Sequence, residues 1–318
     1  MQAPKVSVLM AVYNRPELVK NAIESFLRQT YSNAELLICD DCSTDHTPEV
    51  INDYAIKNKN IKWYKNNANK KFLPTINWLF SIADGEYVCI CDSDDEMSDD
   101  RLEHQLRIIK ECNADAVLSG LARIDNQGSV IFNKPLWDEQ RQIRPNSDEV
   151  IISTGSLFMH HSVLDKVKGY HSYFADSFCG DIYFINSIAT NFKLIYDPKP
   201  VYYYRLTEGS MTQKFNLYQL SKLELSKFLI KQRQDTGTDF LEQNNFEDLE
   251  IKRAAIMCNR KWRAEQYRLY AARAIDEQKT KIGLKMILSS FQYNPLALIN
   301  YKTLWYLIRT SFKGKFLF

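Results

Sequence analysis

The 318-residue sequence contains no apolar run that approaches the ~18–20 residues of a membrane-spanning helix. Its start, Met1–Val12, also lacks the apolar core of a signal peptide, because one strand accounts for the hydrophobic residues there. We therefore expect a chain that does not cross a bilayer.

Acidic residues are missing from the last part of the chain. Residues 278–318 contain seven Lys or Arg and no Asp or Glu, whereas the rest has 34 basic and 39 acidic residues. The net charge of +2 thus conceals an acidic main part and a basic C-terminus. This balance argues against a nucleic-acid-binding catalytic domain and predicts a basic interaction surface at the C-terminus.

Cysteine occurs seven times, an odd number without the spacing of a disulfide framework, which indicates a reducing cytoplasm. Two pairs, Cys39 with Cys42 and Cys89 with Cys91, could contribute to a zinc site. Each pair lies in or beside a strand-like run, where a small thiol packs well, so we favour buried thiols.

The first 120 residues alternate between strand-like and helix-like segments. The expected strands are Lys5–Val12, Glu35–Cys39, Ile61–Tyr64, Glu86–Cys91 and Ala116–Ser119. The expected helices are Pro16–Gln29, a helix from about Thr47, Thr75–Ala83 and Asp100–Cys112. Apolar strands with helices between them predict an α/β fold with a mostly parallel, doubly wound sheet covered on both faces.

The pattern loosens after residue 123 and becomes helical after residue 215. A helix over Ser177–Thr190 and a strand over Val201–Arg205 precede the change. The expected C-terminal helices are Leu217–Gln232, Glu247–Glu277, Thr280–Ser290 and Pro295–Ser311. We expect a catalytic domain over 1–215 and an α-helical region over 216–318.

Polar residues follow three of the expected strands: Tyr13-Asn14, Asp40-Asp41 and Asp92-Ser93-Asp94-Asp95. Ligands of doubly wound sheets bind outside the carboxyl ends of the strands, where these loops converge. A single Asp after a strand is more often a helix cap or turn residue, so the three clusters together are the informative feature.

Asp92 and Asp94 form a pair of carboxylates separated by one residue. Such a pair can ligate Mg²⁺ or Mn²⁺ and leave positions for phosphate oxygens and water. The alternative is that the acidic run only caps the following helix.

The same segments resemble family 2 glycosyltransferases with the GT-A fold, of the type that builds bacterial polysaccharides. Over about residues 4–215 the resemblance rests on the opening strand up to Asn14, the loop Asp40–Asp45, and Asp84–Asp95 followed by Asp100-Arg-Leu-Glu103. Thr154-Gly155, Gly180-Asp181 and Tyr204-Arg205 follow in the family's order.

The resemblance implies roles for individual residues. A nucleotide-sugar donor would contact Ala11, Tyr13, Asp40, Asp41, Lys71, Asp92 and Ser93. Mn²⁺ or Mg²⁺ would be held by Asp92 and Asp94, and Asp181 would be the catalytic base. The chain departs from the family in two places: Ile76 replaces an Arg, so that Lys70 or Lys71 would supply the positive charge, and Thr207 replaces a His that can contact the metal.

These implied roles are chemically consistent with sugar transfer. A cation neutralises the departing nucleoside diphosphate, and a carboxylate makes the acceptor hydroxyl nucleophilic. A single base opposite the leaving group predicts inversion at the anomeric carbon.

Other conspicuous side chains have ordinary structural interpretations. His160 and His161 are neighbours in a strand and should point to opposite faces rather than form a metal pair. Trp137 and Tyr173 fit sugar stacking or packing equally well. Arg101 is expected to pair with carboxylates near the start of its helix.

The C-terminal tail mixes Leu, Ile, Trp, Tyr and Phe with Lys and Arg over Ile282–Phe318. Such helices can lie on an anionic membrane, so that the enzyme would be cytoplasmic and peripheral on the inner membrane, or they can pack as a small subdomain. The first alternative would suit a glycan or lipid-linked acceptor.

Two other functions compete with a glycosyltransferase. A sugar-nucleotide nucleotidyltransferase would normally have a Gly-rich loop after its first strand, and Tyr13–Pro16 has no glycine. A non-catalytic nucleotide-sugar-binding protein would be expected to lose Asp94 or Asp181, and both are present. UDP is the expected nucleotide, while the sugar, the linkage and the oligomeric state stay open.

Overall fold

The computed structural model describes residues 3–145, 154–175, 177, 179–206, 215–277 and 279–313. Contacts divide the chain into a sheet unit, Met1–Gln213, and a helical unit, Lys214–Phe318. From the sequence we expected the division at residue 215. Each unit is described by itself.

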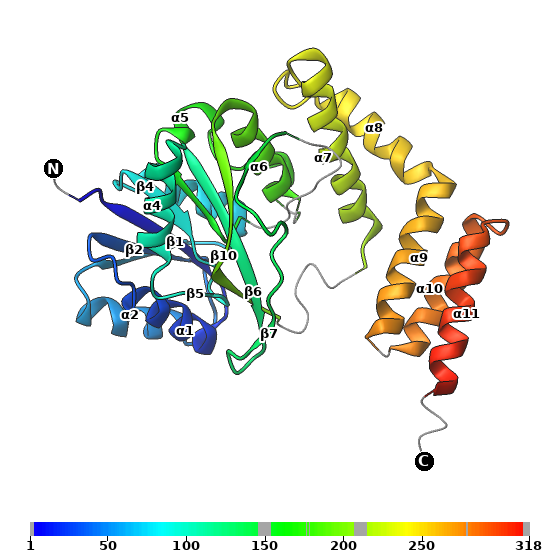
Figure 1. The fold of residues 1–318 in the computed structure, drawn as a ribbon, viewed down its shortest axis with the longest axis horizontal. Helices are drawn as coiled ribbons and strands as arrows, with labels where there is room; N and C mark the ends of the chain where they lie inside the picture. Colours follow the sequence, from blue (N-terminus) through cyan, green and yellow to red (C-terminus); the bar gives the residue numbers. More distant parts are fainter. Residues whose placement is uncertain are drawn as a thin grey trace. The chain divides into compact units, whose positions relative to one another are not determined.

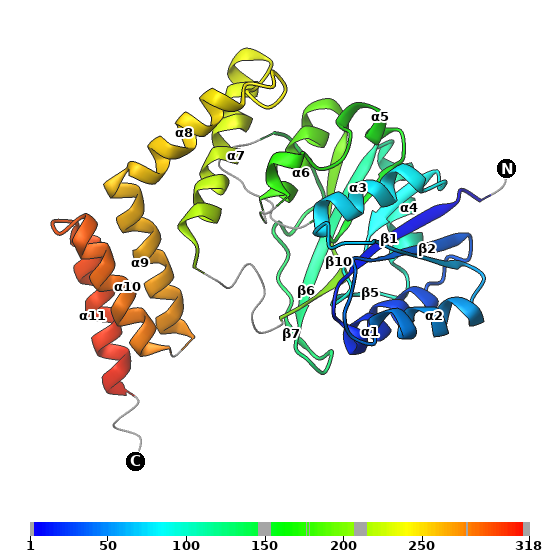
Figure 2. The same cartoon turned by 180° about the vertical axis from the view of Figure 1, so that it is seen from behind.

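The sheet unit is built around a mixed sheet with helices on both of its faces (Figure 1 and, from behind, Figure 2). Its strands are β1 (Val6–Val12), β2 (Ala34–Asp40), β3 (Ile61–Lys65), β4 (Tyr87–Ile90), β5 (Glu96–Met97), β6 (Ala116–Ile124), β7 (Val130–Phe132), β8 (Arg141–Ile143), β9 (Leu157–His160) and β10 (Leu194–Arg205). Its helices are α1 (Pro16–Leu27), α2 (Thr47–Lys57), α3 (Phe72–Ile82), α4 (Arg101–Cys112), α5 (Val163–Val167) and α6 (Gly180–Asn191). A short 3-10 turn, η1, covers Ser172–Phe174.

The strand order β3-β2-β1-β4-β9-β6-β10-β5 confirms the predicted α/β fold. The first four strands are parallel, and β6 runs parallel to β10, whereas β9 is antiparallel to both β4 and β6. β6 and β10 are longer than expected, since β6 continues to Ile124 and β10 begins at Leu194.

The apolar sequence of β1 suits a strand that has helices on both faces of the sheet. Val6, Val8 and Met10 pack in one core with residues of α1 and α4, and α3 contacts β1 as well. All seven residues of β1 are buried, as expected for a strand covered on both faces.

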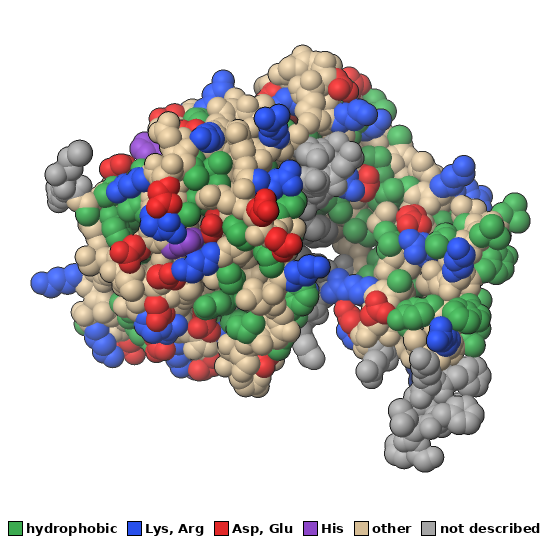
Figure 3. Space-filling view, viewed as in Figure 1, with side chains coloured by type: hydrophobic (Ala, Val, Ile, Leu, Met, Phe, Trp, Pro, Cys, Tyr) green, Lys and Arg blue, Asp and Glu red, His purple; other side chains and the backbone are tan. Residues whose placement is uncertain are grey.

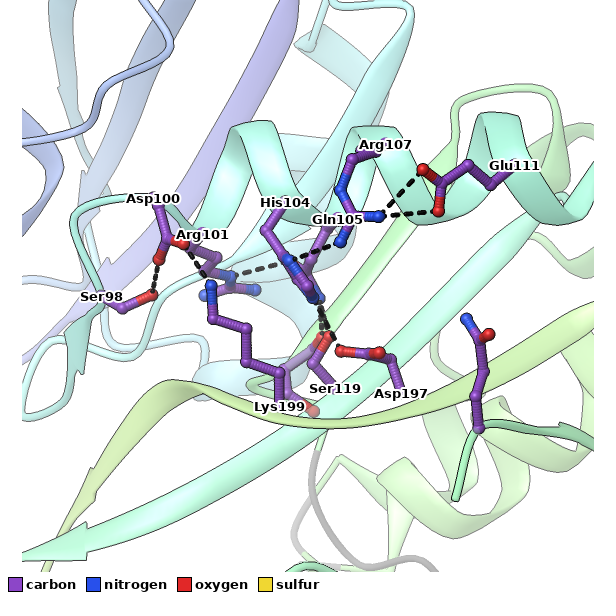
Figure 4. A network of polar contacts seen from close by, with 12 residues as sticks. Ser98, Asp100, Arg101, His104, Gln105, Arg107, Glu111, Ser119, Asp197 and Lys199 are labelled. Carbon is purple, nitrogen blue, oxygen red and sulfur yellow. Dashed lines mark hydrogen bonds and ion pairs between the residues drawn. The ribbon is translucent and has the colours of Figure 1, made fainter. Parts of the chain in front are cut away.

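Polar side chains of α4 are buried against the strands on which the helix packs (Figure 4). Gln105 Nε2 donates to Ser119 Oγ of β6 at 3.0 Å, and His104 Nε2 lies 2.8 Å from Asp197 Oδ2 of β10. These bonds hold α4 in register with both strands, since a buried polar group left without a partner costs stability.

The expectation for Arg101 is wrong. Its fully buried guanidinium donates to Ile90 O at 3.0 Å and Gly155 O at 2.7 Å, and Nε donates to Gln105 Oε1 at 3.0 Å. Because the side chain lies beneath the ends of β4 and β9 and not on the helix surface, it satisfies main-chain oxygens there.

The helical unit contains α7 (Leu217–Thr236), α8 (Phe246–Cys258), α9 (Arg260–Asp276), α10 (Thr280–Tyr293) and α11 (Leu298–Lys313). The single long helix expected over Glu247–Glu277 is wrong, because the chain breaks at Asn259, where ψ is 109°. The Asn259 side chain accepts from Trp262 N and caps α9, which is a favoured role of asparagine. Within the described residues, no helix has the length and apolarity to cross a membrane.

Candidate active site

The register of the parallel strands brings the three predicted polar clusters to one edge of the sheet. Val12 lies opposite Asp40 in the β1–β2 pair, and Leu9 lies opposite Ile90 in the β1–β4 pair. Residues that directly follow these strands are therefore neighbours, as expected at the carboxyl ends of parallel strands.

The loops after β1 and β2 are tied together by hydrogen bonds. Asn14 has a positive φ of 51°, its N–H donates to Ser43 Oγ at 2.9 Å, and its Oδ1 accepts from Thr44 N at 2.9 Å. Ser43 N donates in turn to the buried carboxylate of Asp40 at 3.2 Å. Tyr13 remains 43% exposed beside these bonds, so its ring is available to a ligand.

Asp41 has a different environment from Asp40. Its buried carboxylate accepts from Asn66 Nδ2 and Lys70 N, both at 2.8 Å, from Lys71 N at 2.9 Å and from Thr75 Oγ1 at 3.2 Å. These bonds fix the segment that leads into α3, so Asp41 shapes the loop whatever it does toward a nucleotide. The same bonds use the backbone of Lys71, whose φ is 74°, and leave its side chain exposed.

Asp92 lies just beyond β4 with one carboxylate oxygen unsatisfied. Its N–H donates to Tyr202 Oη at 3.1 Å, whereas Oδ1 is buried and finds no hydrogen-bond partner in the described part of the chain. Burial, followed by the nearby carboxylates of Asp94 and Asp181, raises the pKa of Asp92 to about 7, and Arg15 opposes the shift. The neighbouring Ser93 is buried, as is Ala11 in β1.

Arg15, which we did not single out from the sequence, forms an ion pair with Asp94 through its Nη1. It occupies the start of α1, one residue after the Asn14 turn. Its side chain is 36% exposed and that of Asp94 is 17% exposed, so the pair lies at the surface of the site. The Tyr13–Pro16 run has no glycine, but its guanidinium contacts an acid 79 positions further along the chain, which no local pattern reveals.

Arg205, by contrast, belongs to the framework of the site. Its backbone N–H donates to Asp95 Oδ1 at 2.8 Å and its Nε to Asp94 O at 3.0 Å, and Nη2 pairs with Glu96. The guanidinium is almost completely buried. It therefore holds the acidic loop in place from β10. Burial, with Asp92 and Asp94 close by, raises the pKa of Asp95 well above its usual value.

Asp181 starts α6 and reaches the same region from another part of the chain. Its Oδ2 accepts from Thr154 N at 3.2 Å, and Thr154 Oγ1 lies 2.5 Å from Tyr170 Oη. Burial raises the pKa of Asp181 to about 6 against the opposing hydrogen bonds from Thr154 and Tyr170. The negative charge of Asp181 also contributes to the raised pKa of Asp92.

The carboxylates of Asp92 and Asp94 fit a hard divalent cation. The unsatisfied Asp92 Oδ1 and the paired Asp94 carboxylate are oxygen donors of the kind that Mg²⁺ and Mn²⁺ prefer. Among the described residues, no group of three His, Cys, Asp or Glu is arranged to hold a metal by protein ligands alone. A cation held by two carboxylates would need its other ligands from substrate phosphates and water.

The remaining conspicuous residues are engaged in packing or local bonds. Trp137 packs edge-on against Tyr196 with ring centroids 4.9 Å apart, and His161 Nδ1 lies 3.2 Å from Gly85 O. Burial raises the pKa of the Cys39 thiol to about 12. Tyr173 and His160 also have local partners. Tyr173 packs on Phe174, and His160 Nδ1 lies 2.7 Å from Ser162 Oγ.

Comparison with known proteins agrees with this geometry. The family described as glycosyl transferase family 2 matches residues 7–168, which is half of the chain. The chain is 33% identical to EpsE of Bacillus subtilis, a protein with glycosyltransferase in its name, over 53% of this chain and 59% of that protein. It is 38% identical to WfaP of Escherichia coli, named UDP-Glc:alpha-D-GlcNAc-diphosphoundecaprenol beta-1,3-glucosyltransferase, over 33% of this chain and 41% of WfaP. The chain thus spans about half the length of the curated relatives it matches.

Two solved structures have the same fold at low identity. Staphylococcus aureus TarS 1–349 in complex with UDP-GlcNAc has a TM-score of 0.57 at 22% identity, over 71% of this chain and 66% of that chain. The mannosyltransferase PcManGT of Pyrobaculum calidifontis, in complex with GDP-Man and Mn²⁺, has a TM-score of 0.57 at 16% identity, over 99% and 88%. Because the family match extends over half of the sequence, the chain belongs to glycosyl transferase family 2.

Proposed function

We propose that this chain is a metal-dependent, inverting glycosyltransferase that moves a sugar from a nucleoside-diphosphate sugar to a hydroxyl of a glycan or lipid-linked acceptor. The observation that supports this most directly is the placement of Asp92 and Asp94 where the ends of β1, β2 and β4 meet, together with the charge effect of Asp181 on the pKa of Asp92. Two of these carboxylates suit a cation and the third suits a proton acceptor.

The donor's nucleotide would lie over the ends of β1 and β2. The exposed ring of Tyr13 would stack on the base, and Asp40 would accept a hydrogen bond from it. The Asp40 carboxylate accepts long bonds from Ser43 N, at 3.2 and 3.3 Å, and lies 3.9 Å from Lys65 Nζ, so it retains capacity to accept another. Ala11, Asp41, Lys71 and Ser93 would line the same donor site. We propose UDP as the nucleotide, because the WfaP name includes UDP-Glc and TarS binds UDP-GlcNAc.

Asp92 and Asp94 would hold Mn²⁺ or Mg²⁺ together with the diphosphate. When bound, such a cation supplies Lewis-acid neutralisation of the charge on the departing nucleoside diphosphate. The Mn²⁺ in the PcManGT complex supports a metal in this fold. On the protein side, the buried Asp92 carboxylate costs least when a positive charge faces it, which favours cation binding.

Arg15 would supply the positive charge that the resemblance assigned to Lys70 or Lys71. Its guanidinium already reaches Asp94, so it lies next to any diphosphate held there. Lys70 and Lys71 instead contribute backbone N–H groups to Asp41. A guanidinium can donate two parallel hydrogen bonds to phosphate oxygens, which favours Arg15 for this contact.

Asp181 would accept the proton of the acceptor hydroxyl as the hydroxyl attacks the anomeric carbon. A pKa of about 6 suits a base that must be ionised near neutral pH and still bind the proton usefully. Thr154 N and the Thr154–Tyr170 pair orient the carboxylate. With one base and no covalent intermediate, the sugar would be transferred to the acceptor with inversion at its anomeric carbon.

A lipid-linked acceptor would place the enzyme at the cytoplasmic face of a membrane. The diphosphoundecaprenol in the name of WfaP supports an acceptor of this class. Polysaccharide assembly is the process that the named relatives suggest.

Incubation with a panel of nucleotide sugars, with and without candidate acceptors, tests the reaction. We expect acceptor-dependent release of a nucleoside diphosphate and, by NMR, a product anomer opposite to that of the donor. A parallel incubation with nucleoside triphosphates and sugar 1-phosphates tests the alternative, because a nucleotidyltransferase would join these two into a nucleotide sugar and release pyrophosphate. Nucleotide binding without release under every condition would indicate a non-catalytic binding protein.

A further inference from the structure

The last two helices of the helical unit expose large apolar side chains along one face each. In α11, Leu298, Tyr301 and Trp305 are 78%, 53% and 60% exposed, and Ile308 continues the row. Their spacing of three or four residues places them on one side of the helix. In α10, Leu284 and Leu288 form a similar exposed row. Figure 3 shows hydrophobic side chains gathered over these helices at the right of the view.

The opposite sides of α10 and α11 are occupied by helix packing, so these rows are not an unassembled core. A Cβ on Gly283 would approach Ile275 Cγ1 of α9 to 3.0 Å and Leu307 Cδ1 of α11 to 3.3 Å. Ser290 Oγ, fully buried, lies 2.7 Å from Ala264 O and 2.9 Å from Asn300 Oδ1. Each helix therefore has one side that is packed against its neighbours, and another side on which large apolar side chains are exposed.

Basic residues flank both exposed rows. Lys281 and Lys285 share the exposed side of α10 with Leu284 and Leu288, and Lys302 and Arg309 share that of α11 with Leu298 and Trp305, because each is three or four residues from its apolar neighbour. Neither helix contains an acidic residue. The acids nearest in sequence are already engaged, since Asp276 accepts from Tyr306 Oη at 3.0 Å and Glu277 pairs with Arg273 and Lys279.

Exposed apolar rows with basic residues beside them favour a lipid surface over a protein partner as the ligand of these helices. A protein partner that covered the rows would need to match apolar and basic groups at once, whereas a lipid surface offers acyl chains below and anionic headgroups above at fixed depths. Tryptophan and tyrosine are enriched at that boundary, and lysine and arginine extend from it to the headgroups.

We propose that the exposed sides of α10 and α11, here termed the α10–α11 face, bind the surface of an anionic phospholipid bilayer with both helices lying in the interfacial region. The proposal gives a physical surface to the membrane location suggested above, but it does not depend on the sugar-transfer chemistry. A lipid-linked acceptor would then be met by an enzyme already held on the same surface.

Co-sedimentation of the full chain with vesicles tests the face. We expect binding to phosphatidylcholine vesicles that contain phosphatidylglycerol, and weaker binding to phosphatidylcholine alone or at high salt. Leu298→Ser with Trp305→Ser should weaken binding at least about tenfold. Lys281→Gln with Lys302→Gln should weaken it about fivefold for each charge removed. The matched control is Ile251→Ser with Leu269→Ser, which removes exposed apolar side chains from α8 and α9 and should leave binding unchanged.

Because every replaced side chain is exposed, the variants should keep the parent's melting temperature, and circular dichroism verifies this. Quenching of Trp305 fluorescence by brominated lipids, read as the difference between the parent and Trp305→Phe, supplies a second measurement. Equal sedimentation of the parent and the face variants would overturn the proposal. So would a face variant that converts a dimer to a monomer in light scattering without altering vesicle binding, because the occupant would then be a second copy of the chain.

Discussion

Each of the two units of this chain departs from the usual distribution of polar and apolar groups, the sheet unit at carboxylates and the helical unit at apolar side chains near its C-terminal end. The sheet unit buries carboxylates, and an oxygen each of Asp92 and Asp95 finds no hydrogen-bond partner in the described part of the chain. The helical unit exposes Trp305, Leu296 and Leu298. An unpaired buried polar group and an exposed apolar patch are the two features that a stable, solitary protein avoids.

The difference indicates what each unit lacks. The sheet unit has negative charge held by a rigid frame of hydrogen bonds, which a cation and a phosphate-bearing ligand would complete. The helical unit has a packed interior and an apolar exterior, which a surface would complete. Chemistry and attachment are thus expected to be separable by substitution.

Removal of the metal should have the largest effect on the sheet unit. We expect chelator, or Asp94→Ala, to reduce transfer by roughly a thousandfold or more, because a cation contributes several kcal/mol of charge stabilisation. Mn²⁺ or Mg²⁺ should restore the chelated enzyme but not the variant. Asp99→Ala, which removes an exposed acid of the same loop region, is the control. Full turnover in excess chelator would remove the metal from the mechanism.

Asp181→Asn should reduce transfer by about 10²–10⁴, the usual range for loss of a general base. The amide oxygen of asparagine can still accept from Thr154 N, as the Asp181 carboxylate does, so folding should be retained. Calorimetry should find donor and metal affinity unchanged while kcat falls. The control is Asp165→Asn, an exposed acid in the first turn of α5. Near-normal turnover would leave Asp181 with a structural role only, as the acceptor of the hydrogen bond from Thr154 N.

Arg15→Met should weaken binding of UDP in the presence of Mn²⁺ by roughly ten- to a hundredfold, the value of a hydrogen bond to a charged group. Lys71→Met is the matched comparison, since the structure shows its backbone and not its side chain at the site. Titration calorimetry distinguishes the two. A larger loss in the Lys71 variant would assign the diphosphate contact to the lysine.

The pH dependence should sharpen the role of Asp181. Since its pKa is raised to about 6, kcat/KM should fall about tenfold per pH unit as the pH drops below that value. Stability has the opposite sign: the folded state binds this proton more tightly than the unfolded state, so this group's contribution declines as pH rises from about 4 through 6. Asp181→Asn should therefore raise the melting temperature by a few degrees at pH 8 and leave it unchanged at pH 4. If Asp181→Asn and the parent had the same melting temperature at both pH values, the pKa of Asp181 would not be raised in the folded state.

The smallest expected effect lies in the helical unit. Asn259→Ala removes the cap of α9 and should lower the free energy of unfolding by about 1 kcal/mol. Asn259→Asp keeps a capping oxygen and should be nearly neutral. Chemical denaturation measures both, and transfer activity should be unaffected. A stabilised alanine variant would mean that α8 and α9 prefer to form one continuous helix.

Local signals in the sequence were sufficient for most of the sheet unit. The apolar runs of β1, β2 and β4 and the polar residues after them indicated a parallel sheet and a site at its carboxyl edge, because each signal lies within a few residues. The break at Asn259 was missed, since the helical periodicity continues across it and one asparagine is a weak stop signal. The strand β10 was recognised only from Val201, because Pro198 and Pro200 interrupt its first part.

Other features depend on residues far apart in the chain and gave no local signal. Asp41 is engaged by the segment 66–75, Arg101 by the ends of β4 and β9, and the acidic loop by Arg205. A charged residue in a sequence motif can bind a ligand or hold the surrounding structure in place, and only its neighbours in the fold distinguish the two. The Arg15–Asp94 pair belongs to this group, since 79 positions separate its members.

By itself the sequence determined the α/β class, the acidic pair Asp92 and Asp94 and the basic C-terminus, because composition, periodicity and short motifs are local properties. The candidate base Asp181 was implied by the family resemblance. The tertiary structure decided which charges face one another, which are buried enough to have a raised pKa, and which apolar residues of α10 and α11 remain exposed. These are outcomes of burial and long-range packing, and burial is set by the whole fold rather than by any one segment.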